Sequence, residues 1–211
     1  YACGRLGGDT AFLNAVGDDP LGGELVRNLQ QANVDTRAIR TVDGVSTGMA
    51  VVCVDEKGNN SIIVIPGANN LCDVDYLRRN RARFEESDIV LLQMEIPFES
   101  VCYAVELASG LHKTVILNPA PAPDSLPDEV YAGLDYLTPN ESEFKHLTGC
   151  PTDEVEELAV HCKPLLEKGT RNIIITLGSR GVAYLSESGE LLVAPAAKNI
   201  RVMDPTAAGD R

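Results

Sequence analysis

The segment Arg171-Asn172-Ile173-Ile174-Ile175-Thr176-Leu177, followed at once by Gly178-Ser179-Arg180-Gly181, predicts the fold most directly. Its run of β-branched residues is typical of a strand, and the glycines predict a tight turn where the strand ends. Ligands of open α/β sheets bind at the carboxyl ends of the parallel strands. The turn therefore has two interpretations: an ordinary glycine turn, or a loop whose amides, with Arg180 nearby, hold a phosphate.

Working outward, three more apolar runs end in polar residues in the same way. They are residues 88–95, ending in Glu95, residues 113–118, ending in Asn118, and residues 135–138, followed by Pro139. The first is continuous enough to predict a strand buried on both faces. Helical patterns at 98–109 and 153–168 alternate with these strands, and a strand at 10–17 precedes a helix from about 20 to 32. This alternation predicts an α/β fold with a mostly parallel sheet.

Two stretches interrupt the alternation with β-rich pairs. Residues 49–54 and 61–65 predict strands of one hairpin, and residues 182–185 and 191–195 predict a second. The first hairpin, within residues 45–69, is a candidate flap beside the main sheet. Residues 75–83 predict a basic helix, best interpreted as a solvated face, and residues 200–203 predict a last strand.

Asn140 and Glu143 stand three residues apart at the predicted start of a helix, so both can face one point. An amide oxygen and a carboxylate there could position a hydrated Mg²⁺ carried by nucleotide phosphates. The alternative is a capping pair, with Asn140 as N-cap and Glu143 reaching back to it. The pattern by itself favours the capping pair.

The chain closes with Asp204-Pro205-Thr206-Ala207-Ala208-Gly209-Asp210-Arg211. Such small residues let a ligand approach the peptide N–H groups, and a helix beginning here would favour an anion. Asp210 could then act as general base for a hydroxyl that attacks a phosphoryl group. The alternative is an ordinary turn with an N-cap aspartate.

Composition limits the classes of function. The 211 residues include 18 Lys+Arg and 31 Asp+Glu, a net charge of −13, so nucleic acid and anionic membranes are poor partners. No signal peptide and no apolar stretch long enough to span a membrane is seen. The six cysteines contain no C-x-x-C pair and predict buried, reduced thiols of a cytoplasmic protein.

In combination these strand ends make the chain resemble the ribokinase-like sugar kinases, the pfkB carbohydrate kinase family. The resemblance runs from Tyr1 to Arg211, and Leu92-Gln93-Met94-Glu95 and residues 117–122 match best. It implies a three-layer α/β/α domain over residues 1–211, with the hairpin at about 45–69 as a lid that often doubles as a homodimer contact. It also implies ATP-dependent phosphorylation of a sugar hydroxyl, ribose to ribose 5-phosphate first, with Mg²⁺ and a monovalent cation, K⁺.

The resemblance carries the following roles onto this sequence. Asp210 is the catalytic base, the amides of Ala207, Ala208 and Gly209 form the anion hole, and Glu95 binds the sugar. The residues that bind the nucleotide and its phosphates are Asn140, Thr176, Gly178, Ser179, Arg180 and Gly181. Glu143 lies near Mg²⁺ through water, and Asp204 and Thr206 form part of the K⁺ site.

The chain also departs from the family pattern. The family's first strand, with its sugar-binding Asn and Asp, has no match here, and the adenine-binding loops are expected after Arg211. The sequence thus resembles the middle of such an enzyme. Fructose, 2-keto-3-deoxygluconate and nucleosides stay open as substrates, as does an inactive fragment or ligand-binding module.

Overall fold

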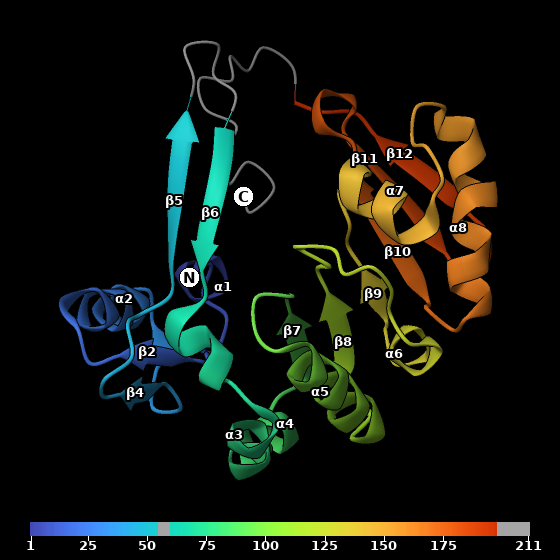
Figure 1. The fold of residues 1–211 in the computed structure, drawn as a ribbon. Helices are drawn as coiled ribbons and strands as arrows, with labels where there is room; N and C mark the ends of the chain where they lie inside the picture. Colours follow the sequence, from blue (N-terminus) through green and yellow to red (C-terminus); the bar gives the residue numbers. More distant parts are fainter. Residues whose placement is uncertain (55–59, 198–211) are drawn as a thin grey trace. The chain divides into compact units, whose positions relative to one another are not determined.

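The structure, a computed structural model, describes residues 1–54 and 60–197 (Figure 1). The hairpin turn and the last strand predicted at 200–203 lie outside the described residues. The described chain divides into two compact units, here called the first unit, residues 1–83 and 95–100, and the second unit, residues 84–94 and 101–197.

The first unit begins with a short helix and two pairs of short parallel strands. Helix α1 (Ala2–Arg5) precedes β1 (Thr10–Ala11), which pairs with β3 (Val34–Asp35), and β2 (Ala15–Gly17) pairs with β4 (Arg40–Val42). The prediction of one strand at 10–17 is therefore wrong, because the segment forms two separate strands, β1 and β2. Asn14 interrupts it, because its side-chain Oδ1 accepts the Ala15 N–H at 2.8 Å.

Helix α2 (Pro20–Gln31) confirms the predicted helix and is capped by Asp19. The Asp19 carboxylate accepts the N–H of Gly22 at 2.8 Å, and the N–H and hydroxyl of the buried Thr47, both at 2.7 Å. These hydrogen bonds, that from the Thr47 N–H first, hold the pKa of Asp19 below its usual value. One carboxylate thus joins the start of α2 to the segment that leads into the hairpin.

Strands β5 (Met49–Val54) and β6 (Asn60–Ile65) are antiparallel, which confirms the predicted hairpin. In Figure 1 they form a long ribbon that projects from the rest of the first unit. Side chains on both faces are exposed, among them Val51, Val52, Ile62 and Ile63. A 3₁₀ helix, η1 (Gly67–Leu71), follows the hairpin.

The predicted basic helix is two helices, α3 (Val74–Arg79) and α4 (Arg81–Glu86), so the prediction of one helix is wrong. The break lies at Asn80, whose side-chain amide donates to the Tyr76 carbonyl at 2.9 Å. Such a side chain competes with the backbone for helical hydrogen bonds. Arg78 is exposed and pairs with Asp75, in keeping with a solvated face.

The second unit contains a six-stranded sheet in the order β12-β11-β10-β9-β8-β7. Strands β7 (Ile89–Leu92), β8 (Thr114–Leu117), β9 (Tyr136–Leu137) and β10 (Asn172–Thr176) are parallel, and β11 (Val182–Ser186) and β12 (Leu191–Ala194) continue it antiparallel. This confirms a mostly parallel α/β fold. The expected double burial of β7 is wrong: Ile89 is 57% and Leu91 63% exposed, and these alternate residues lie on one face of the strand.

Four helices accompany the sheet strands: α5 (Phe98–Gly110), α6 (Asp128–Ala132), α7 (Glu141–Thr148) and α8 (Leu158–Glu167). The helix predicted at 153–168 starts late, because a 3₁₀ turn, η2 (Val155–Glu157), precedes α8. Short α6 has no predicted counterpart. Leucine, isoleucine and valine fill the core, with Leu117, Leu137, Ile173 and Ile175 almost wholly buried.

All six cysteines are free thiols, but the expected burial holds for only some of them. Cys72 and Cys162 are buried, and burial raises the pKa of each thiol to about 12. Cys3 and Cys53 are exposed, the latter because it lies on the projecting hairpin. In the described residues, no helix has the length and hydrophobicity needed to cross a membrane.

Candidate functional site

The carboxyl ends of the parallel strands bring two sequence-predicted motifs together in the second unit. Asn140, which lies beyond the end of β9, forms an isolated parallel bridge with Thr176, the last residue of β10. The Thr176 N–H donates to the Pro139 carbonyl at 3.1 Å, and the Thr138 N–H donates to Leu117 at 2.9 Å. The start of α7 and the glycine turn after β10 are therefore neighbours, as ligand-binding edges of parallel sheets require.

Asn140 and Glu143 form a capping box at the start of α7. Asn140 Oδ1 accepts the Glu143 N–H at 2.9 Å, and Glu143 Oε2 accepts the Asn140 N–H at 2.8 Å. The Ser142 hydroxyl also donates to Asn140 Oδ1, at 2.8 Å. The capping interpretation is thus confirmed, and it leaves Glu143 Oε1 without a hydrogen-bond partner among the described residues.

The environment of Glu143 makes its charge costly. Burial raises the pKa of this carboxyl, and the hydrogen bond from the Asn140 N–H offsets part of the rise. A cation bound at Oε1 would stabilise the ionised form of this carboxylate, because Oε2 is already occupied by the Asn140 N–H. Within the described residues no group of three or more His, Cys, Asp or Glu side chains could hold a metal, so a cation here would rely on this carboxylate and on its own ligands.

The glycine turn after β10 forms the short 3₁₀ helix η3 (Gly178–Arg180). The N–H groups of Arg180 and Gly181 are used inside the turn, donating to Leu177 at 3.0 Å and Gly178 at 3.1 Å. The N–H groups of Gly178 and Ser179 donate to no residue in the described part of the chain. Two backbone donors therefore stay available at the carboxyl edge, which is what an anion site needs.

Gly181 is held between the turn and the neighbouring strand. Its φ is 100°, and a Cβ atom here would lie 2.0 Å from the Ala194 carbonyl oxygen and 2.7 Å from the Ala196 nitrogen. Gly178 also has a positive φ, 55°, but a Cβ there would meet nothing within 4 Å. The second glycine of the motif is thus required by packing against the chain at the end of β12, and the first by backbone conformation alone.

Arg180 does not extend freely from the turn. Its Nη1 donates to the carbonyls of Thr152 at 2.7 Å and Asp153 at 2.8 Å, and its Nη2 pairs with Glu141 Oε1. Glu141 is the residue that sequence reasoning missed at this edge. Its acidic character between Asn140 and Glu143 was a visible signal, but its partner lies 39 residues away.

The remaining sequence-predicted residues belong to the first unit or lie outside the described residues. Glu95 follows β7 in the chain, is exposed, and belongs to the first unit. The other predicted residues lie outside the described residues; they are Asp204, Thr206, Ala207, Ala208, Gly209 and Asp210.

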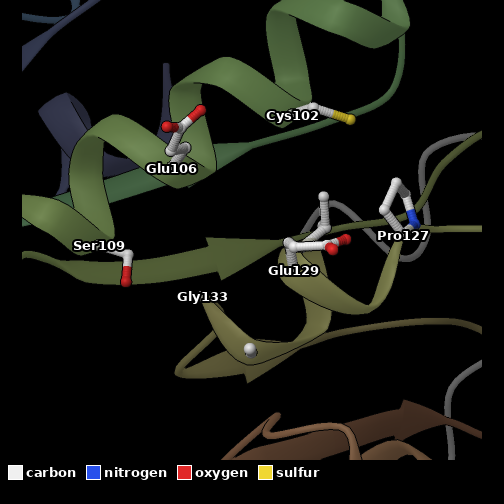
Figure 2. A pocket seen from close by; sticks show the side chains of 8 residues that line it. Cys102, Glu106, Ser109, Pro127, Glu129 and Gly133 are labelled. Atoms are coloured by element: carbon white, nitrogen blue, oxygen red, sulfur yellow. The ribbon is translucent and has the colours of Figure 1, made fainter.

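A hollow of about 640 Å³ in the second unit lies elsewhere, between α5 and α6. Figure 2 shows Cys102, Glu106 and Ser109 on one helix facing the segment that carries Pro127 and Glu129. It includes none of the residues singled out from the sequence. Its two carboxylates would repel a phosphate, so it does not compete as the anion site.

Removing the Asn140 side chain tests its capping role. Asn140→Ala is expected to lower the free energy of unfolding by about 1 kcal/mol, because the N-cap bond to Glu143 is lost. Asn140→Asp keeps an N-cap acceptor and is the matched control for stability. Urea unfolding of both variants measures the difference. Equal losses from Ala and Asp would contradict the capping role.

Comparison with known proteins identifies the family of this chain. The family model of the pfkB family carbohydrate kinases matches residues 1–211. The chain is 32% identical over 209 residues to a deoxyribokinase of Salmonella typhi, covering 99% of this chain and 68% of that protein. It is 34% identical over 209 residues to a ribokinase of Haemophilus influenzae, covering 99% of this chain and 67% of that protein.

A solved structure gives the same result for the fold. Arabidopsis thaliana ribokinase complexed with ribose and ATP superposes with a TM-score of 0.85 at 28% identity, covering 99% of this chain and 68% of that one. The chain therefore spans about two thirds of the length of these relatives. With a family model matched end to end and relatives above 30% identity, this chain belongs to the pfkB family of carbohydrate kinases.

Proposed function

We propose that this protein transfers the γ-phosphoryl group of ATP to a hydroxyl of ribose, giving ribose 5-phosphate. One observation carries the nucleotide half of the proposal: the start of α7 and the Gly178–Gly181 turn are joined at the carboxyl edge of the sheet by the Asn140–Thr176 bridge. The similarity to ribokinases supports the sugar half.

The nucleotide phosphates bind at this edge. The N–H groups of Gly178 and Ser179 hold phosphate oxygens, and the Thr176 hydroxyl and the Asn140 side chain complete the set. Backbone donors suit this chain, because with 31 acidic and 18 basic residues it has few cations to spare for a polyphosphate.

The donor set at Glu143 fits Mg²⁺. Mg²⁺ keeps several waters and binds through one or two carboxylates and substrate phosphates, so a single carboxylate with Oε1 available is sufficient. When bound with the nucleotide, the ion neutralises phosphate charge. Glu143 holds its carboxylate towards the ion's water shell, while Oε2 keeps the capping bond to Asn140.

Outside the described residues, the resemblance supplies the catalytic half. Asp210 takes the proton from the sugar hydroxyl, and the amides of Ala207, Ala208 and Gly209 stabilise the developing charge. Asp204 and Thr206 contribute to a K⁺ site. Within the described residues, Glu95 binds the sugar. The hairpin at about 45–69 serves as lid and homodimer contact of one ribokinase-like domain, and the enzyme works in the cytoplasm.

A second substrate is favoured by one observation: a relative at 32% identity over 209 residues is a deoxyribokinase. A coupled assay of ADP release, run on the intact protein with ribose, 2-deoxyribose, fructose and 2-keto-3-deoxygluconate, tests both. Ribose should give the highest kcat/KM. A higher value for 2-deoxyribose would transfer the assignment to that sugar, and no turnover of any sugar with ATP and Mg²⁺ would overturn it.

The raised pKa of Glu143 predicts a pH dependence of Mg²⁺·ATP binding. Because burial raises this pKa, the carboxylate protonates at a higher pH than an ordinary glutamate does, and affinity should fall as it protonates. The effect on folding stability has the opposite pH dependence. Because the folded state favours protonated Glu143, this residue stabilises the fold at low pH, and that stabilisation is lost as the pH rises through the folded pKa.

Glu143→Gln is the matched variant, since glutamine at this position also completes a capping box. Calorimetric titration of Mg²⁺·ATP, carried from neutral pH down to the ordinary glutamate pKa, should show an affinity that falls on acidification in the parent and a flatter, weaker affinity in the variant. An unchanged pH profile in Glu143→Gln would contradict the role.

A further inference from the structure

Arg180 connects three segments of the second unit that are distant in sequence. Its backbone belongs to the glycine turn, its Nη1 reaches the carbonyls of Thr152 and Asp153, and its Nη2 reaches Glu141. Glu141 is the first residue of α7, next to Asn140. The guanidinium thus ties the turn, the start of α7 and the 152–153 segment to one another.

These contacts leave Arg180 poorly placed to grip a phosphate. Three acceptors already use two of its nitrogens, in the forked geometry that only arginine offers. The pair with Glu141 also has an electrostatic consequence. An unpaired carboxylate beside the edge where phosphate binds would repel the ligand, and Arg180 neutralises it.

We propose that Arg180 is a positioning residue for nucleotide binding, acting through Glu141 rather than by contact with the phosphates. The ion pair holds the Gly178 and Ser179 amides at a set place relative to Asn140 and Glu143, and cancels the Glu141 charge. The role rests on the proposed function, because it assumes that nucleotide phosphates bind at this edge.

The alternative is direct contact, the role that the sequence suggested for Arg180. The two roles differ in what they predict for Glu141. If Arg180 binds phosphate directly, releasing it with Glu141→Gln should leave ATP affinity unchanged or improve it. If Arg180 acts through Glu141, the same change should weaken ATP binding.

The ion pair itself contributes little to stability. The two side chains are 36% and 40% exposed, and such surface pairs contribute only about 0–1 kcal/mol to folding. Each single variant should therefore stay folded, so that a change in ATP affinity reports positioning. The exposed Lys168–Asp128 pair of the same unit, with N···O 2.9 Å, provides a matched control that does not involve the turn or α7.

The test measures ATP affinity by calorimetry, and kcat and KM for ATP, in Arg180→Gln, Arg180→Lys, Glu141→Gln and the double Arg180→Gln/Glu141→Gln variant, with Asp128→Asn as control. We expect Arg180→Gln and Glu141→Gln each to raise the Kd for ATP roughly tenfold. An effect of this size is usual for residues that belong to one contact network. The double variant should be no weaker than either single variant. Arg180→Lys should recover part of the loss by restoring the charge, and Asp128→Asn should bind as the parent does.

Three outcomes would overturn the inference. ATP affinity kept or improved in Glu141→Gln but lost in Arg180→Gln would show direct phosphate contact. Unchanged ATP affinity in both single variants would show a structural contact only. Losses that add in the double variant would show independent roles. If the parent protein binds no ATP, the proposed function itself is wrong. This result is distinct from the three above, because it is seen in the parent before any variant is compared.

Discussion

Asp210→Asn is expected to lower kcat for sugar phosphorylation by about 10²–10⁴-fold, the usual contribution of a general base. Asparagine has nearly the same shape as aspartate but cannot accept the proton of the attacking hydroxyl. Transfer itself needs little covalent help from the protein, so the residual rate comes from positioning and charge stabilisation. ATP affinity should stay close to that of the parent, because the nucleotide contacts proposed at Asn140 and Gly178 are not altered.

A coupled ADP assay at saturating ribose and ATP, with ATP titration by calorimetry, measures the two quantities separately. Asp128→Asn, the same chemical change at an exposed position, is the control and should retain full activity. Turnover at the parent's rate in Asp210→Asn would remove Asp210 from the catalytic role. Loss of ATP binding together with activity would instead indicate that Asp210 holds the fold or the nucleotide.

Gly181→Ala is expected to lower the free energy of unfolding by about 3 kcal/mol, the sum of a positive-φ backbone conformation that strains other residues by roughly 1–3 kcal/mol and overpacking at roughly 1–3 kcal/mol. The added methyl group would lie 2.0 Å from the Ala194 carbonyl oxygen, so β12 or the turn must move. Since the turn carries the Gly178 and Ser179 amides, ATP binding should weaken as well.

Gly189→Ala is the matched control, because Gly189 also has a positive φ, 81°, but a Cβ there would meet nothing within 4 Å. It should cost only the backbone term, about 1–2 kcal/mol, and leave ATP binding unchanged. Urea unfolding of both variants and ATP titration provide the comparison. Equal stability of the two variants would mean that packing against Ala194 is not what requires glycine in the turn.

Local pattern was sufficient for much of this fold. The β-branched run at 172–176, the alternating segments before it and both hairpins appear as predicted, because side-chain periodicity and turn residues act within a few positions of the chain. Two of the wrong predictions, the single strand at 10–17 and the single helix at 75–83, have local causes that side-chain periodicity does not reveal. Asn14 and Asn80 bond to nearby backbone and interrupt elements that read as continuous.

From the sequence alone we could predict the kind of most of the longer elements, the strand ends where polar residues gather, and the likeness to the pfkB kinases. Tertiary structure decided which groups at that edge stay available. Arg180 reads as a phosphate ligand in the sequence, yet it is bound by Glu141, 39 residues distant. Glu143 can both cap α7 and offer one oxygen, and Gly181 is glycine because Ala194 lies against it. Each of these depends on a partner brought close only by folding, and hydrogen-bond capacity used by that partner is no longer available to a ligand.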